Sequence, residues 1–252
     1  MVALHELVSH CDSLLEVERF KDYCPNGLQI EGRAQVDRIL LGVTASQALI
    51  DRAVAMGVDA VLVHHGFFWK GEAQPIVGIK ARRIGALMRA NISLLAYHLP
   101  LDAHPELGNN RQLGERLGFA VQGVFGRIGE MEIGLYGELP SPMSGEKLAR
   151  HIGEKLQREP VHVAACRRPL QKIAWCTGGA QSYFEAAIAR GVDAFITGEI
   201  SEPNYHLALE HEVDFFAAGH NATERYGVQA LGNYLSQRFD VQCTFFELAN
   251  PA

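Results

Sequence analysis

Histidine and carboxylate side chains follow several predicted strands of this chain, in the segments that come after the strands end. Ligands collect at the carboxyl ends of the strands in parallel α/β sheets, so we expect these side chains to share one edge. Imidazole and carboxylate groups together suit divalent zinc, iron, manganese, cobalt or nickel, and no thiolate is needed. The pattern therefore predicts a metal site. Its candidate residues are His64, His65, His98, Asp102, Glu199, His220 and Glu224.

Two pairs among these candidates repeat one spacing, a histidine followed after three residues by a carboxylate. His98 precedes Asp102 in this way, and His220 precedes Glu224. A carboxylate such as Glu224 can bridge two cations, and two adjacent histidines can each serve one of them. These residue types could therefore hold two ions.

Each candidate also has a structural interpretation. A single histidine at a strand end is commonly a hydrogen-bonded structural residue. Glu224 could complete a capping box with Asn221 as N-cap, and Asp102 could cap or turn the chain. His104 is assigned a structural role, because it lies directly before a proline. The remaining histidines are expected to be solvated: His5, His10, His151, His162, His206 and His211.

The elements that must position these residues alternate between strand-length apolar runs and helix-length amphipathic stretches, which predicts an α/β fold with largely parallel sheets. A helix is expected over 4–17, and the prolines at 140 and 142 indicate a looser connection in the middle of the chain. Strands are expected at 38–43, 60–63, 93–97, 172–176, 194–197, 214–217 and 241–246.

An internal repeat organises the chain. The segment that starts at Val43 matches the segment that starts at Cys176, and Gly57 to Ala60 matches Gly191 to Ala194 with an offset of 134 residues. In this alignment His65 falls on Glu199. We therefore expect two copies of one α/β unit that face each other across an approximate twofold. Their expected ranges are 1–125 and 126–252, with the C-terminal segment intertwined with the first half.

Charge and composition argue against a nucleic-acid-binding, a secreted or a membrane-spanning protein. The net charge is −6, and no run of Lys and Arg offers a nucleic acid a basic surface. No signal peptide or membrane span is recognised, and the five scattered cysteines indicate reduced thiols in a cytoplasmic protein.

The glycine turn at 177–179 could present N–H groups to an anion. A basic cluster could hold phosphate or form a solvated helix face: Lys70, Lys80, Arg82 and Arg83.

Several motifs along the chain carry a family resemblance. They are VTAS at Val43, DAVLVHHGFFWKGE at Asp59, YHLPLDAHPELGNN at Tyr97, GVDAFITGE at Gly191 and AAGHNATERYG at Ala217, together with PNGLQIEG at Pro25. They resemble the Nif-three-like dinuclear-metal family, whose bacterial members are labelled homologs of the type 2 form of GTP cyclohydrolase I. The resemblance covers nearly the whole chain and matches the short bacterial form.

The resemblance implies two duplicated, intertwined α/β halves with mixed, mostly parallel sheets and a dinuclear metal cleft between them. It also implies a ring-shaped homohexamer and places His98 beside the metal site. Carried over position by position, the ligands of two divalent ions are His64, His65, Asp102, His220 and Glu224.

Three functions fit these observations. The first is a metal-dependent hydrolase that acts on a nucleotide such as GTP, with His98 or Glu199 moving protons. The second is a metal chaperone or storage ring without turnover, which the lack of a substrate motif favours. The third is a ring-shaped adaptor with structural metal, which predicts a closed coordination sphere.

Overall fold

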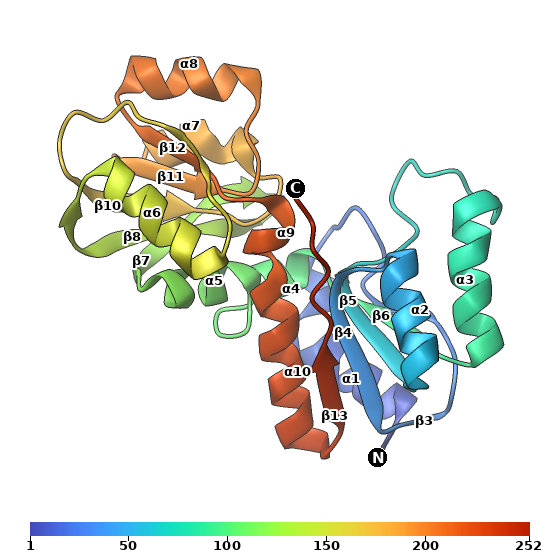
Figure 1. The fold of residues 1–252 in the computed structure, drawn as a ribbon. Helices are drawn as coiled ribbons and strands as arrows, with labels where there is room; N and C mark the ends of the chain where they lie inside the picture. The colour runs from blue at the N-terminus through green and yellow to red at the C-terminus, as the bar shows by residue number, and fades with distance from the viewer. The chain divides into compact units, whose positions relative to one another are not determined.

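The computed structural model describes residues 1–252, which form two compact units (Figure 1). The first unit comprises 1–104 and 227–249, and the second comprises 105–226 and 250–252. The boundary expected near residue 125 falls inside the second unit, because α5 (Asn109–Leu117) and β7 (Ala120–Ile128) contact strand β8 (Met131–Met143) of the second sheet. The segment 227–249 belongs to the first unit, so each unit is built from separate stretches of chain.

The first unit contains a five-stranded sheet in the order β13-β4-β5-β6-β2. The four strands from β13 to β6 are parallel, and β2 runs antiparallel to β6. The strands predicted for this unit are confirmed, whereas β2 was not anticipated. The bounds are β2 (Gly27–Ile30), β4 (Arg38–Thr44), β5 (Ala60–His65), β6 (Ser93–Ala96) and β13 (Gln242–Phe245), beside a small pair of β1 (Val2–Ala3) and β3 (Gln35–Val36).

Helices cover both faces of this sheet (Figure 1). On one face, α2 and α3 bury an apolar cluster that includes Leu40, Val61 and Leu94 of the sheet. On the other face, Gly232 of α10 lies against Leu41, where a larger residue would overlap. The bounds are α1 (Leu4–Leu14), η1 (Val17–Arg19), α2 (Gln47–Met56), α3 (Gly78–Ala90), α4 (Leu99–Ala103) and α10 (Arg225–Phe239), of which α10 starts in the second unit.

The second unit contains a six-stranded mixed sheet in the order β7-β8-β10-β11-β12-β9. On one face α5 and α6 pack on Trp175, and on the other α7 brings Phe184 against Phe195. The bounds are β8 (Met131–Met143), β9 (Val161–Val163), β10 (Leu170–Trp175), β11 (Ala194–Thr197), β12 (Asp214–Ala217), α6 (Gly145–Leu156), η2 (Gln181–Tyr183), α7 (Phe184–Ile188), α8 (Glu202–His211) and α9 (His220–Thr223). No helix in the chain has both the length and the hydropathy of a membrane span.

The looser connection expected around Pro140 and Pro142 is wrong, because both prolines lie within β8. They fall beyond Glu138, the last residue of β8 that pairs with β7, and within an irregular stretch of the pairing with β10. Proline has no N–H group to donate to a ladder, so strands tolerate it at edges and irregularities such as this one. The hairpin of β7 and β8 was not recognised from the sequence.

The duplication inferred from the sequence is confirmed by the strand order and register of the two units. Strands β4, β5 and β6 pair in parallel in the same order as β10, β11 and β12. Ala60 pairs with Ile39 and Ser93, and Ala194 pairs with Ile173 and Asp214 at the equivalent positions.

An aspartate that follows the repeated glycine makes the same contacts in both units. One carboxylate oxygen accepts a hydrogen bond from an arginine side chain, and the other accepts from two successive backbone N–H groups. The donors are Arg33, Asp37 and Arg38 for Asp59, and Arg168, Gln171 and Lys172 for Asp193. Each aspartate thereby ties the start of its central strand to the strand beside it.

Candidate metal centre

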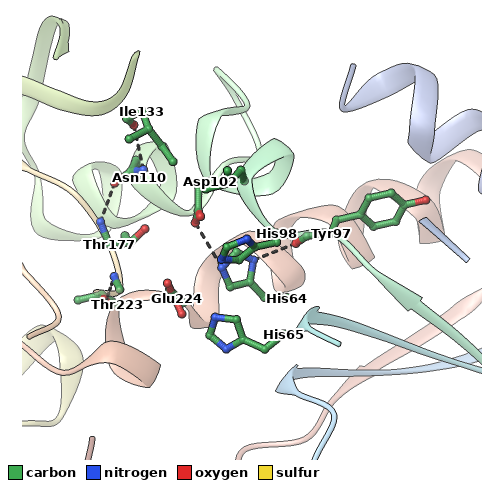
Figure 2. Close-up of polar contacts among 12 residues, drawn as sticks. His64, His65, Tyr97, His98, Asp102, Asn110, Ile133, Thr177, Thr223 and Glu224 are labelled. Carbon is green, nitrogen blue, oxygen red and sulfur yellow. Dashed lines mark hydrogen bonds and ion pairs between the residues drawn. The ribbon is translucent and has the colours of Figure 1, made fainter. Parts of the chain in front are cut away.

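The parallel pairing of β5 and β6 brings the carboxyl ends of these strands together. Val63 pairs with Ala96, so His64 and Tyr97 follow at neighbouring positions. His64 is fully buried, and its Nδ1 lies 2.9 Å from the carbonyl oxygen of Tyr97 (Figure 2). Its Nε2 lies 3.5 Å from Oδ1 of Asp102 on α4. Because a carbonyl oxygen only accepts, Nδ1 of His64 carries the proton and Nε2 carries the lone pair.

His65 is the last residue of β5, and its side chain is partly exposed. It pairs with Thr44 in the ladder, and the Thr44 hydroxyl lies 3.1 Å from Nδ1 of His65. The imidazole of His65 has its centroid 4.6 Å from that of His64 and 5.9 Å from that of Trp69. The two adjacent histidines are therefore packed against each other, although successive side chains of a regular strand point to opposite faces.

His98 is held by a buried carboxylate from the N-terminal part of the chain. Nδ1 of His98 donates to Oδ1 of Asp22 at 2.7 Å, and the backbone N–H of His98 donates to Oδ1 of Asn26 at 2.7 Å. Asp22 also accepts hydrogen bonds from the Asn26 side chain and from the N–H of Leu99. Burial raises the pKa of Asp22, but the hydrogen bond and charge of His98, with these further donors, hold it below its usual value.

The first unit thus gathers four of the predicted residues, namely His64, His65, His98 and Asp102. His64, His65 and His98 each offer a ring nitrogen, and these atoms lie within 4.8 Å of one another. Sequence reasoning missed Asp22 and Thr44, which orient two of these rings. Asp22 lies 76 residues from His98, and no local pattern marks it as a partner.

The second unit gathers the other three predicted residues, Glu199, His220 and Glu224. His220 opens α9, and its Nδ1 donates to Oε1 of Glu199 at 2.6 Å. Its Nε2 lies 3.1 Å from Oε2 of Glu224. Burial lowers the pKa of His220, but the hydrogen bonds and charges of Glu224 and Glu199 outweigh it and raise this pKa to about 9.

A glycine turn after β10 approaches this second cluster closely. Gly178 has a φ of +69°, a conformation that residues with side chains rarely adopt, and a Cβ atom there would overlap Oε1 of Glu224. The N–H of Gly178 donates to the hydroxyl of Thr223, and the N–H of Thr177 donates to Oδ1 of Asn110 (Figure 2). These N–H groups therefore bind within the chain, in contrast to the anion site that the glycine turn suggested.

Two structural interpretations of single residues are wrong, and one member of the basic cluster already has an acidic partner. The capping box with Asn221 is wrong, because Gly219 is the N-cap of α9 and Glu224 lies at its C-terminal end. His162 is not simply solvated, since it bonds Asp214 at 2.8 Å and stacks on a buried phenylalanine. Lys80 pairs with Glu72 at 3.3 Å, so part of the basic cluster proposed for phosphate is already neutralised.

Comparison with known proteins identifies one family that matches this chain. The family model described as Duf34/NIF3 (NGG1p interacting factor 3) matches residues 2–251. A Pseudomonas aeruginosa protein named GTP cyclohydrolase 1 type 2 homolog is 56% identical and covers 100% of this chain and 99% of its own length.

Solved structures agree with this result. The structure of protein ybgI, described as of unknown function, has a TM-score of 0.96 at 47% identity, with 100% of both chains covered. The structure of TTHA1606 from Thermus thermophilus has a TM-score of 0.88 at 31% identity, again with 100% of both chains covered. The predicted α/β fold class is therefore confirmed.

Proposed function

Because the chain belongs to the Duf34/NIF3 family, we propose that it binds two divalent metal ions and hydrolyses a nucleotide-like substrate. The proposed ligands are His64, His65, Asp102, His220 and Glu224.

The donor chemistry of each cluster fits divalent transition ions. Imidazole nitrogens and carboxylate oxygens are the ligands such ions take in proteins, and ligating histidines commonly donate their other N–H to an oxygen. Here Nδ1 of His64 donates to a carbonyl and Nδ1 of His220 donates to Glu199. This pairing of histidine with an oriented acceptor is the observation that carries the proposal. The metal could be zinc, iron, manganese, cobalt or nickel.

Two bound cations would supply Lewis acidity and lower the pKa of water at the site. The chain itself would supply orientation and proton transfer. His98 is proposed to move a proton through Nε2, because Asp22 holds the proton on Nδ1. Glu199 is the second proposed proton carrier, and its side chain is 47% exposed although one of its oxygens bonds His220.

The substrate class rests on the relatives, which are named GTP cyclohydrolase 1 type 2 homolog. A nucleotide such as GTP is proposed on that ground, and the exposed Lys70 and Arg82 are available for its phosphates. Five free cysteines fit a reducing, cytoplasmic setting, and a homohexameric ring is proposed from the family resemblance.

The test measures metal content and nucleotide hydrolysis on one preparation. Metal-stripped protein is reloaded separately with Zn²⁺, Mn²⁺, Fe²⁺, Co²⁺ and Ni²⁺, and each form is offered GTP and other nucleoside triphosphates. Two ions per chain together with metal-dependent turnover support the proposal. Two ions without turnover under any metal would leave a metal-handling protein in place of a hydrolase.

A further inference from the structure

The centroids of three imidazole rings in the first unit lie about as far apart as those of three histidines that bind one metal ion. The ring centroids of His64 and His65 lie 4.6 Å apart, those of His64 and His98 5.0 Å, and those of His65 and His98 5.7 Å. A tetrahedral zinc ion with Zn–N distances of about 2.0–2.1 Å holds its imidazole centroids about 5 Å apart. The three rings therefore need little rearrangement to share one ion.

Each of the three rings has its Nδ1 next to an oxygen of the same unit. His64 faces the carbonyl of Tyr97, His65 faces the hydroxyl of Thr44, and His98 faces the carboxylate of Asp22. The carbonyl and the carboxylate only accept, so His64 and His98 carry the proton on Nδ1 and bind metal through Nε2; the Thr44 hydroxyl is able to accept from Nδ1 of His65 in the same way. Such oxygen partners are what metal-binding histidines have, because they fix the tautomer and the ring orientation.

The groups around His98 favour the binding of a cation by its imidazole. Its partner Asp22 accepts four hydrogen bonds and has a side chain that is 3% exposed, so the carboxylate is fixed in place. The indole of Trp69 meets the His98 ring edge to face, with centroids 5.0 Å apart, and covers one side of the cluster. A rigid carboxylate behind the imidazole raises its basicity toward metal.

The geometry points to a three-imidazole site for one transition-metal ion, formed by His64, His65 and His98 within the first unit. It shares two residues with the two-ion centre and rests on that proposed function for the class of ligand, a divalent transition ion. Three histidines and one water complete a tetrahedral sphere. In this single-ion state His98 is a ligand, and it becomes available for proton transfer when both ions are bound to the other ligands.

The test removes the ligands of the second unit. The double variant His220→Ala/Glu224→Ala is stripped of metal and titrated with Zn²⁺ and with Co²⁺, whose absorption spectrum reports tetrahedral coordination. We expect one ion per chain. Adding His98→Gln should abolish this binding, whereas adding His104→Ala, a neighbouring histidine outside the cluster, should leave it unchanged.

A second measurement of metal affinity leaves all three histidine ligands in place. Asp22→Asn in the same double variant keeps all three histidines but removes the charge behind His98, and it should weaken Zn²⁺ binding by about 10- to 100-fold. Circular dichroism and urea unfolding show whether each variant is folded. An Asp22→Asn variant that is folded and binds with unchanged affinity contradicts the role of His98 as a ligand.

The outcomes separate this inference from the two-ion proposal. If the wild type binds two ions and the double variant binds none, the three-imidazole site is refuted and the two-ion centre stands. The three-imidazole site is also refuted if the ion persists unchanged after His98→Gln. If the wild type binds one ion that depends on His98 and not on Glu224, the two-ion function is refuted and the three-imidazole site stands.

Discussion

Gly178 and Glu224 lie so close together that a methyl group at position 178 would overlap Oε1 of the glutamate. The two residues belong to the same unit, 46 residues apart in sequence, and the turn at Gly178 is fixed by the hydrogen bond of its N–H to Thr223. Two features therefore require glycine at position 178. Its φ is positive, and the carboxylate of Glu224 occupies the space that a Cβ atom would need.

Gly178→Ala should lose both stability and metal. Gly191 provides a matched control, because it has the same φ of +69° and nothing within 4 Å of a Cβ atom. A left-handed alanine costs about 1–2 kcal/mol at either position, but only position 178 displaces Glu224. Urea unfolding and elemental analysis of both variants compare the two effects. Equal metal content in the two variants would show that the position of this carboxylate does not matter for binding.

Glu224→Ala should markedly reduce the metal content, because a proposed bridging carboxylate is removed. Elemental analysis after reloading and gel filtration measures this, with His104→Ala as the control that keeps full occupancy. Full occupancy in Glu224→Ala would falsify the bridging role. A stability measurement on the metal-free forms distinguishes loss of a ligand from loss of the fold.

His98→Ala should lower nucleotide turnover by about 10²–10⁴-fold while the protein at saturating metal keeps both ions. The reason is that Asp22 fixes the Nδ1 proton of His98, which leaves Nε2 to accept and release a proton. Metal content and hydrolysis are measured on the same preparation. Loss of ions at saturating metal would instead mean that His98 is needed for coordination in the two-ion state.

Asp59→Asn should destabilise the first unit by about 1–3 kcal/mol, because it breaks a buried network with an arginine and two backbone N–H groups. Burial raises the pKa of Asp59, but the hydrogen bonds from these donors and the charge of Arg33 lower it by more, so the folded value lies below 3.8. The stabilisation is therefore present above this unfolded value and is lost as the pH falls through the folded pKa.

Urea unfolding at about pH 7 and about pH 3 tests this dependence. The wild type should lose more stability than Asp59→Asn over that interval, because the amide of the variant does not titrate. Asp51→Asn, at an exposed position of α2, should behave like the wild type at both pH values. A wild type and an Asp59→Asn variant with parallel acid dependence would rule out this carboxylate as the source.

The sequence alone was sufficient for the repeated α/β units and for their central strands. Continuous apolar runs identify buried parallel strands, and the glycine-flanked repeat at Asp59 and Asp193 identifies the duplication. The antiparallel strands β7, β8, β2 and β9 were not recognised, because their burial is partial or their apolar runs are short. Pro140 and Pro142 were misread, since a proline tolerated at an irregular strand looks like a loop residue in sequence.

The candidate residues could be predicted because parallel strands place whatever follows them at one edge of a sheet. The orientation of each imidazole could not be predicted, because it depends on hydrogen-bond partners that folding brings from elsewhere in the chain. Asp22 reaches His98 from the N-terminal region, and Thr44 reaches His65 across two paired strands. The sequence thus determined which groups are candidate metal ligands. The tertiary structure decided which nitrogen His64 and His98 present, because acceptor oxygens distant in sequence hold the proton on Nδ1 of these two rings.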